Sequence, residues 1–123
     1  MRVVYAGLAL SIIMAASGTA QAQDAAAGKA TFMGRCGACH QVETAKSGPI
    51  APSLKGVVGR KIGSLSDFNY SDALKAKGGR WTPAGLESFL ASPMKTVPGT
   101  KMMMAVPVAT DRANLVAYLK TVK

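Results

Sequence analysis

The pattern of apolar and polar residues predicts short helices separated by long irregular segments. A first helix is expected to run to about Cys36 with Asp24 as its N-cap, because a carboxylate can accept hydrogen bonds from the first free N–H groups. A second helix over residues 71–77 should end at Gly78-Gly79, since glycine terminates helices without steric cost. Strand signals are weak throughout.

Two more helices are expected in the C-terminal part of the chain. Thr82 is a suitable N-cap and Pro83 a suitable first residue for one of them, which should end before Pro93. Thr110 and Asp111 are expected to cap the last helix. Its apolar residues recur at i, i+3, i+4 and i+7, which predicts one inward face formed by Leu115, Tyr118, Leu119 and Val122.

Residues 41–65 show no apolar period and are rich in glycine, proline and serine. Gly48-Pro49 and the segment 51–53 (APS) resist regular structure, so this part is predicted to be a long loop. A loop of this length fits a compact domain when it packs on a bound group. The chain is therefore predicted to be all-α, with three to five helices and long loops around one cofactor.

The N-terminal segment has the pattern of a secretory signal peptide. Arg2 supplies a positive charge, residues 3–16 are almost continuously apolar, and Ala20-Gln21-Ala22 offers small residues for cleavage. We therefore expect a signal peptide over residues 1–22 and one exported, periplasmic domain over residues 23–123. An uncleaved membrane anchor is the alternative, although the apolar run is short for a bilayer span of about 20 residues.

The chain is strongly basic, with 15 Lys and Arg against 6 Asp and Glu and a formal net charge of +9. Such a charge favours acidic partner proteins and weak contact with anionic membrane surfaces. Nucleic acid is not expected as a partner, because export separates the two and the chain has no recognition motif. The sequence shows no apolar stripe of the kind that forms an interface between copies, so a monomer is expected.

The run Cys36-Gly37-Ala38-Cys39-His40 is the attachment signature of a c-type haem. Two thiols at this spacing can form thioether links to the two vinyl groups, and the adjacent imidazole can bind the iron. A redox disulfide would need a βαβ pattern, a zinc site would need a fourth ligand, and a structural disulfide would not explain the histidine. These are the only cysteines and the only histidine in the chain. The run predicts one covalently bound haem c with His40 as the proximal ligand.

A second axial ligand must be something other than histidine. Beyond residue 22 the chain has five methionines, whose thioether sulfur is the obvious candidate: Met33, Met94, Met102, Met103 and Met104. Met33 is too close to Cys36 in the same helix to reach the opposite haem face. Spacing alone does not choose among the three consecutive methionines, and methionines in small proteins commonly serve only in packing.

Over nearly all of residues 23–123 the chain resembles the class I cytochromes c, which are small electron carriers with one haem. Residues 97–102 (VPGTKM) are similar to the ligand loop of that family, which implies that Met102 is the sixth ligand. Residues 52–60 (PSLKGVVGR) resemble the segment whose proline carbonyl accepts a hydrogen bond from the axial histidine. This implies a bond from His40 to Pro52, although extra residues before Pro52 leave Pro49 as an alternative.

The resemblance also implies roles for three residues near a haem propionate. Arg60 would stabilise its charge, and the Tyr70 hydroxyl and the Trp81 indole N–H would donate hydrogen bonds to it. It further implies that Gly28 and Phe32 cross the last helix near Leu115 and Tyr118. Phe89 and Leu74 stand where many relatives have polar residues, so the polar network beside the haem is expected to be reduced.

The function implied by the resemblance is periplasmic electron transfer, without enzymatic activity of its own. Lys95, Lys101 and Lys55 would contribute to a basic rim that steers acidic-faced partners such as oxidases, reductases or dehydrogenases. A haem protein with an open sixth position, peroxidase-like or gas-binding, is one alternative, but the chain has no second histidine to act as a distal base. A membrane-tethered subunit of a respiratory complex is the other.

Overall fold

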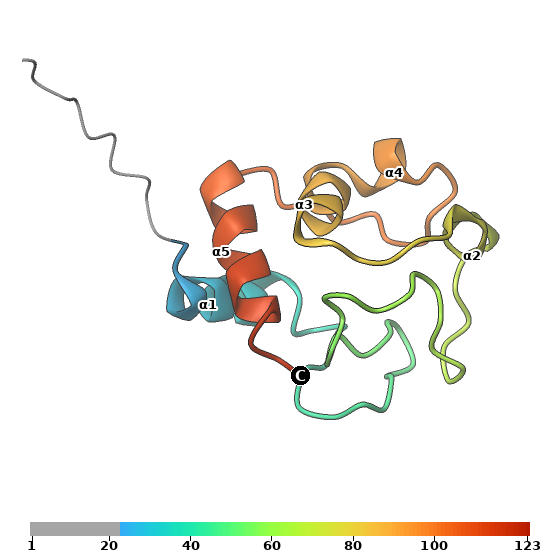
Figure 1. Cartoon of the computed structure of the whole chain (residues 1–123), viewed down its shortest axis with the longest axis horizontal. Helices are drawn as coiled ribbons and strands as arrows, with labels where there is room; N and C mark the ends of the chain where they lie inside the picture. Colours follow the sequence, from blue (N-terminus) through green and yellow to red (C-terminus); the bar gives the residue numbers. More distant parts are fainter. Residues whose placement is uncertain (1–22) are drawn as a thin grey trace, which may run out of the picture.

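The structure is a computed structural model and describes residues 23–123 (Figure 1). The predicted signal peptide, residues 1–22, lies outside the described residues, so its cleavage stays a prediction. Among the helices of the described part, none combines the length and the apolar character needed to span a bilayer.

The described residues form five helices joined by long loops: α1 (Ala25–Arg35), α2 (Asp72–Lys77), α3 (Pro83–Ala91), α4 (Pro93–Thr96) and α5 (Ala109–Leu119). Extended pairing within residues 23–123 is limited to one isolated antiparallel bridge between Lys61 and Arg80. The prediction of an all-α domain with three to five helices and long loops is confirmed.

Side-chain caps begin three of the helices, and those of α1 and α3 are the predicted ones. The carboxylate of Asp24 accepts hydrogen bonds from the N–H groups of Ala26 and Ala27 at the start of α1. Thr82 Oγ1 accepts from the N–H of Gly85, 3.0 Å away, at the start of α3. Ser71 does the same for α2, which ends at Gly78 with a positive φ of 69°. These short polar residues therefore fix helix starts without help from distant parts of the chain.

The start of α5 differs from the prediction. The helix begins at Ala109, and its N-cap residue, Val108, makes no side-chain capping bond, so Thr110 and Asp111 lie within the first turn rather than capping the helix. Instead, the Nη1 atom of Arg112 donates to the carbonyls of Val106 and Pro107, 3.0 and 2.8 Å away. The guanidinium thus satisfies two backbone carbonyls just before the helix, whose N-cap lies two residues before the predicted Thr110.

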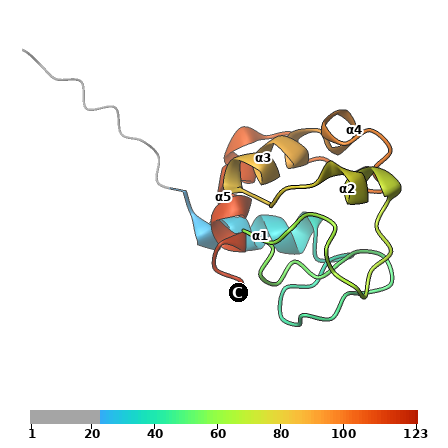
Figure 2. The same cartoon turned by 45° about the vertical axis from the view of Figure 1, so that its right-hand side comes forward.

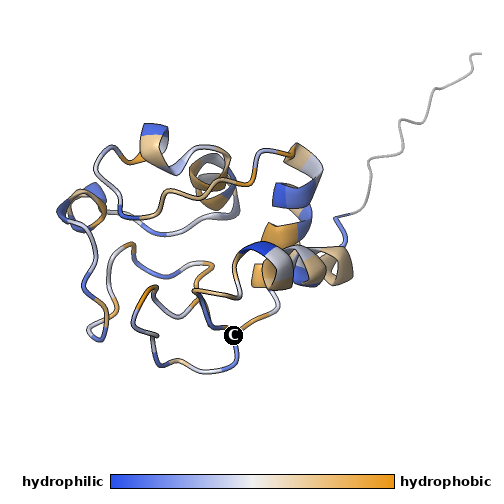
Figure 3. Cartoon of the chain, turned by 180° about the vertical axis from the view of Figure 1, so that it is seen from behind, coloured by the Kyte–Doolittle hydropathy of each residue, from blue (hydrophilic) through white to orange (hydrophobic). Residues whose placement is uncertain are grey.

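α1 and α5 pack across each other at one end of the molecule (Figures 1 and 2). Gly28 and Phe32 are buried in α1, and Leu115, Val116 and Leu119 are buried in α5. The rings of Phe32 and Tyr118 pack with centroids 5.7 Å apart. This crossing was predicted from the resemblance and is confirmed. Figure 3 shows that α5 carries strongly hydrophilic as well as strongly hydrophobic residues, as expected for a helix with one buried face.

The loop between α1 and α2 contributes directly to the core. Val57 and Ile62 are 2 % and 6 % exposed and belong to the same cluster as Trp81 and Leu86. The loop is tied to the segment before α3 by hydrogen bonds from the Gly59 N–H to the Trp81 carbonyl and from the Trp81 N–H to the Arg60 carbonyl, at 2.7 and 2.9 Å.

The loops and the remaining helices form two sides of the molecule. In Figures 1 and 2 the loops after α1 lie on one side, and α3, α4 and the segment leading to α5 lie on the other. The chain therefore brings the residues that follow α1 and those that follow α4 to a shared interior.

Candidate functional site

The Cys36–His40 run forms a tight turn directly after α1. The N–H of Cys36 donates to the carbonyl of Phe32, and the N–H groups of Cys39 and His40 donate to the carbonyl of Cys36, at 3.1 and 2.9 Å. Both cysteines are free thiols; Cys36 is half-buried, Cys39 is exposed, and burial raises the pKa of the Cys36 thiol. The turn leaves both sulfur atoms unpaired and therefore free for covalent attachment.

The imidazole of His40 is held by the loop that follows it. Its Nδ1 atom lies 2.8 Å from the carbonyl oxygen of Pro52. A carbonyl only accepts, so Nδ1 carries the proton and Nε2 has the free lone pair that a metal needs. Burial is the main cause that lowers the pKa of His40, which favours this neutral, metal-binding form. Of the two prolines left open by the sequence, Pro52 makes the bond.

Met102 differs from the other described methionines in its packing. It is half-buried and contacts the hydrophobic core, whereas the others are from 55 to 74 % exposed: Met33, Met94, Met103 and Met104. A turn precedes it, in which the N–H of Thr100 donates to the carbonyl of Val97 at 3.0 Å, and the N–H of Met102 donates to Thr100 Oγ1 at 3.3 Å. This turn directs one thioether, and not its two successors, toward the interior.

Gly99 is needed for this turn. Its φ is 92°, in the left-handed region, and an added Cβ would lie 3.2 Å from the Cβ of Ala73. A residue with a side chain would therefore be strained in its backbone and would press on the segment that contains α2.

Arg60 lies near both Trp81, whose N–H donates to the Arg60 carbonyl, and Tyr70, which influences its pKa. Arg60 is half-buried, and its Nη1 and Nη2 atoms donate to the carbonyls of Lys55 and Ser53, at 3.2 and 2.8 Å. Burial lowers the pKa of Arg60, while the nearby Tyr70 acts in the opposite direction. The Tyr70 hydroxyl accepts from the N–H of Leu65 at 3.3 Å. Their contact with a haem propionate stays a prediction.

Phe89 and Leu74 are the two apolar residues that stand where many proteins of the resembled family have polar ones. The rings of Trp81 and Phe89 pack with centroids 5.1 Å apart, and Phe89 is 6 % exposed. Leu74 is half-buried and packs against the same core. Phe89, Leu74 and Met102 therefore all contribute to the same hydrophobic core.

Sequence reasoning missed three polar residues that support the site. Ser47, Ser53 and Asp67 are linked by hydrogen bonds in the loops that flank Pro52. They form no sequence motif, because they lie up to 20 residues apart in segments without periodicity. For Ser53 alone there was a signal in the sequence, because it directly follows the proline that bonds His40.

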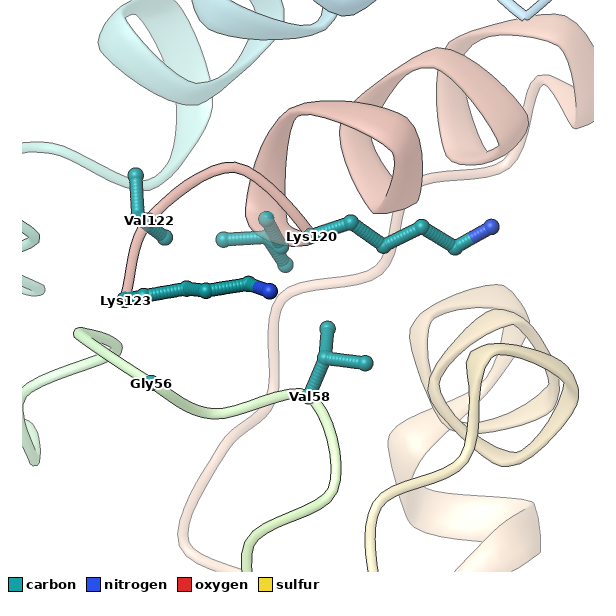
Figure 4. Close-up of a pocket in the computed structure, with 6 residues that line it drawn as sticks. Gly56, Val58, Lys120, Val122 and Lys123 are labelled. Carbon is teal, nitrogen blue, oxygen red and sulfur yellow. The ribbon is translucent and has the colours of Figure 1, made fainter.

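A separate hollow of about 320 Å³ lies between residues 56–58 and the end of α5 (Figure 4). Val58, Leu119 and Val122 line it together with Lys120 and Lys123. The N–H of Gly56 donates to the carbonyl of Val122 at 2.7 Å and joins its two sides. Its lining includes no residue predicted to bind the cofactor. The hollow lies where the C-terminal segment packs on the loop.

The donor set fits a covalently attached haem. Two unpaired thiols stand at the attachment spacing, a neutral imidazole presents Nε2, and one thioether points toward the core. Imidazole nitrogen and thioether sulfur are the axial ligands typical of electron-carrying c-type haems. A zinc site is not supported, because the described residues contain no group of three or more His, Cys, Asp and Glu that could hold a metal ion.

Comparison with known proteins supports the same class. The profile of the Cytochrome c family matches residues 25–123. Cytochrome c2 of Agrobacterium tumefaciens is 42 % identical over 100 residues, covering 78 % of this chain and 89 % of that protein. The c-type cytochrome cy of Rhodobacter capsulatus is 44 % identical over 99 residues, and the match covers 80 % of this chain but only 49 % of that longer protein.

A solved structure agrees with these relatives. Cytochrome cH from Methylobacterium extorquens superposes with a TM-score of 0.73 at 46 % identity, covering 80 % of this chain and 98 % of that one. The chain belongs to the cytochrome c family. It is an electron-transfer protein with one covalently bound haem c, and the alternatives with an open sixth position gain no support from these relatives.

Proposed function

We propose that the protein is a periplasmic one-electron carrier in which His40 and Met102 are the axial ligands of the haem iron. The observation that carries this assignment is the packing of Met102 against the core, while the other four described methionines are exposed. On the His40 side, the 2.8 Å bond to Pro52 holds the imidazole with Nε2 free. Cys36 and Cys39 would hold the haem as thioethers.

The surrounding residues tune this pair of ligands. When bound, the haem supplies the one-electron change between Fe(II) and Fe(III). The soft thioether of Met102 favours the reduced form and hence a high reduction potential. Leu74 and Phe89 add to this effect, because apolar surroundings disfavour the additional charge of the oxidised form. The hydrogen bond from His40 to Pro52 acts in the opposite sense, since it makes the imidazole a stronger electron donor.

Arg60, Tyr70 and Trp81 are proposed to hold a haem propionate. Two nitrogens of Arg60 are bonded to backbone carbonyls, which fixes the guanidinium in place. An arginine has five N–H donors, so further donors are free for a carboxylate. Tyr70 and Trp81 are buried, and each has a polar tip that a propionate would satisfy.

We further propose that the carrier is a monomer without enzymatic activity and that its partners are acidic-faced oxidases, reductases or dehydrogenases. The net charge of +9 would steer such partners and permit weak contact with anionic membranes. Lys95 and Lys101 flank the methionine loop, and Lys101 Nζ donates to the Asn69 carbonyl at 2.9 Å. Lys95 is therefore the freer of the two cations for steering.

An absorption spectrum of the ferric holoprotein tests the ligand assignment. His/Met ligation predicts a weak near-infrared charge-transfer band from sulfur to iron, and reduced protein that binds carbon monoxide poorly at neutral pH. A ferric spectrum without the band, together with rapid and complete carbon monoxide binding, would favour the open-site alternative and refute this function.

A further inference from the structure

The bond between His40 and Pro52 depends on a loop that contains no helix or strand, so other contacts must hold it. Ser53, the residue after Pro52, is only 1 % exposed. Its hydroxyl donates to the carbonyl of Thr44 and accepts from the N–H of Lys55, which lies 3.2 Å away. Ser53 is therefore the internal anchor of the segment that presents the Pro52 carbonyl.

Ser53 is in turn held by residues from two other parts of the loop region. Its N–H donates to Ser47 Oγ at 3.0 Å. Ser47 is bonded twice to the carboxylate of Asp67, with its Oγ 2.8 Å from Oδ1 and its N–H 2.8 Å from Oδ2. Both carboxylate oxygens are thus used on one residue, and segments 20 positions apart are joined.

The direction of these bonds is fixed by the carboxylate. A charged Asp67 only accepts, so the single hydroxyl proton of Ser47 points to it. The oxygen of Ser47 then has lone pairs free to accept from Ser53. The two bonds from Ser47 lower the pKa of Asp67, so the carboxylate is charged at neutral pH. Hydrogen bonds connected in this way polarise one another.

We propose that Ser47 and Asp67 are positioning residues for His40, which act through Ser53 by holding the Pro52 carbonyl against Nδ1. The proposal rests on the proposed role of His40 as an iron ligand. Neither residue touches the imidazole or would touch the haem iron. Their contribution is to keep the Pro52–His40 bond short and thereby keep the imidazole a strong donor, which lowers the reduction potential.

The test is the reduction potential of the holoprotein in matched variants. Ser47→Ala removes the hydroxyl without changing charge, and we expect the potential to rise. Ser47→Thr keeps a hydroxyl and should stay near wild type. Asp67→Asn should also raise the potential, and Asp72→Asn controls for the loss of one exposed negative charge. Asp24→Ala removes the N-cap of α1 and controls for general destabilisation, so it should lower the melting temperature without a comparable change in potential.

A second measurement reports on the bond itself. In the reduced holoprotein, the Nδ1 proton of His40 should exchange with solvent faster in Ser47→Ala than in Ser47→Thr or wild type, as followed by NMR. If Ser47→Ala and Asp67→Asn lose stability but keep the wild-type potential and exchange rate, the proposal is wrong. A wild-type ferric protein without the near-infrared band would instead refute the proposed function, so the two failures are distinguishable.

Discussion

Gly28 of α1 lies directly against the backbone of Asn114 in α5. A β-carbon built at residue 28 would be 1.9 Å from the carbonyl oxygen of Asn114 and 2.9 Å from the Cβ of Tyr118. The same contact is reinforced at the start of α1, where the N–H of Asp24 donates to Asn114 Oδ1 at 3.0 Å. The absence of a side chain at one position thus sets how closely the two longest described helices approach.

We therefore expect Gly28→Ala to destabilise the protein. The added methyl group cannot be accommodated unless the helices move apart, and overpacking of this kind costs about 2 kcal/mol. Denaturant unfolding of the holoprotein, followed by circular dichroism, measures the change in the free energy of unfolding.

Gly34→Ala is the matched control on the same helix. A Cβ at residue 34 meets nothing within 4 Å, so alanine should leave stability unchanged or raise it by roughly 0.5–1 kcal/mol through better helix propensity. Equal effects of the two substitutions would show that the close approach of α1 and α5 is not what residue 28 provides.

Met102→Ala should open the sixth coordination position. The expected results are loss of the ferric near-infrared band, a lower reduction potential, and rapid binding of carbon monoxide to the reduced protein. Absorption spectroscopy and redox titration measure all three. Met103→Ala and Met104→Ala remove exposed side chains and should retain the band. If Met104→Ala alone abolished the band, the ligand would be assigned to the wrong methionine.

Short-range sequence patterns predicted the helices better than they predicted features that depend on contacts with other segments. The caps at Asp24 and Thr82 follow from a polar side chain and its own next turn, so the sequence alone identifies them. The start of α5 has no side-chain cap, and Arg112 instead bonds two carbonyls before the helix, a contact that capping rules do not contain. α4 has four residues, too few to show a period.

In the candidate site, too, features set by neighbouring residues were predictable and features set by distant contacts were not. Spacing identified the haem attachment run, because its chemistry is confined to five consecutive residues. The choice between Pro49 and Pro52 depended on the path of the loop, which Ser47 and Asp67 fix across 20 residues. The proposed choice of Met102 among the three consecutive methionines rests on the turn at Gly99 and on burial, which the sequence expressed only through resemblance to a family.

Stability should depend on pH through Asp67. Its pKa is lowered in the folded protein, chiefly by the backbone and side-chain hydrogen bonds from Ser47, with a smaller contribution from the charge of Arg60. As the pH falls, the unfolded chain therefore binds the proton at a higher pH than the folded protein does. The free energy of unfolding must then rise with pH between the folded and unfolded pKa values. The contribution is complete above the unfolded pKa of about 4 and is lost as pH falls through the folded pKa.

Measuring the free energy of unfolding between about pH 2 and pH 6 tests this effect. Asp67→Asn should flatten the curve in that window relative to wild type, because the titrating group is gone. Ser47→Ala should flatten it partly, since the backbone N–H of residue 47 still donates. Parallel curves for wild type and Asp67→Asn would mean that the Ser47–Asp67 bonds do not persist in solution.

Lys95→Glu should slow electron transfer to an anionic oxidant such as ferricyanide. Lys95 is exposed in α4, immediately before the segment that carries Met102, so its charge should attract anions to the part of the molecule that holds the proposed sixth ligand. Lys120→Glu makes the same change in net charge at the hollow beside the end of α5, whose lining includes no proposed haem ligand. Stopped-flow rates at low ionic strength should fall several-fold more for Lys95→Glu than for Lys120→Glu, and the difference should shrink as salt screens the charges. Equal rates for the two variants would show that only the total charge matters and that α4 has no special part in steering.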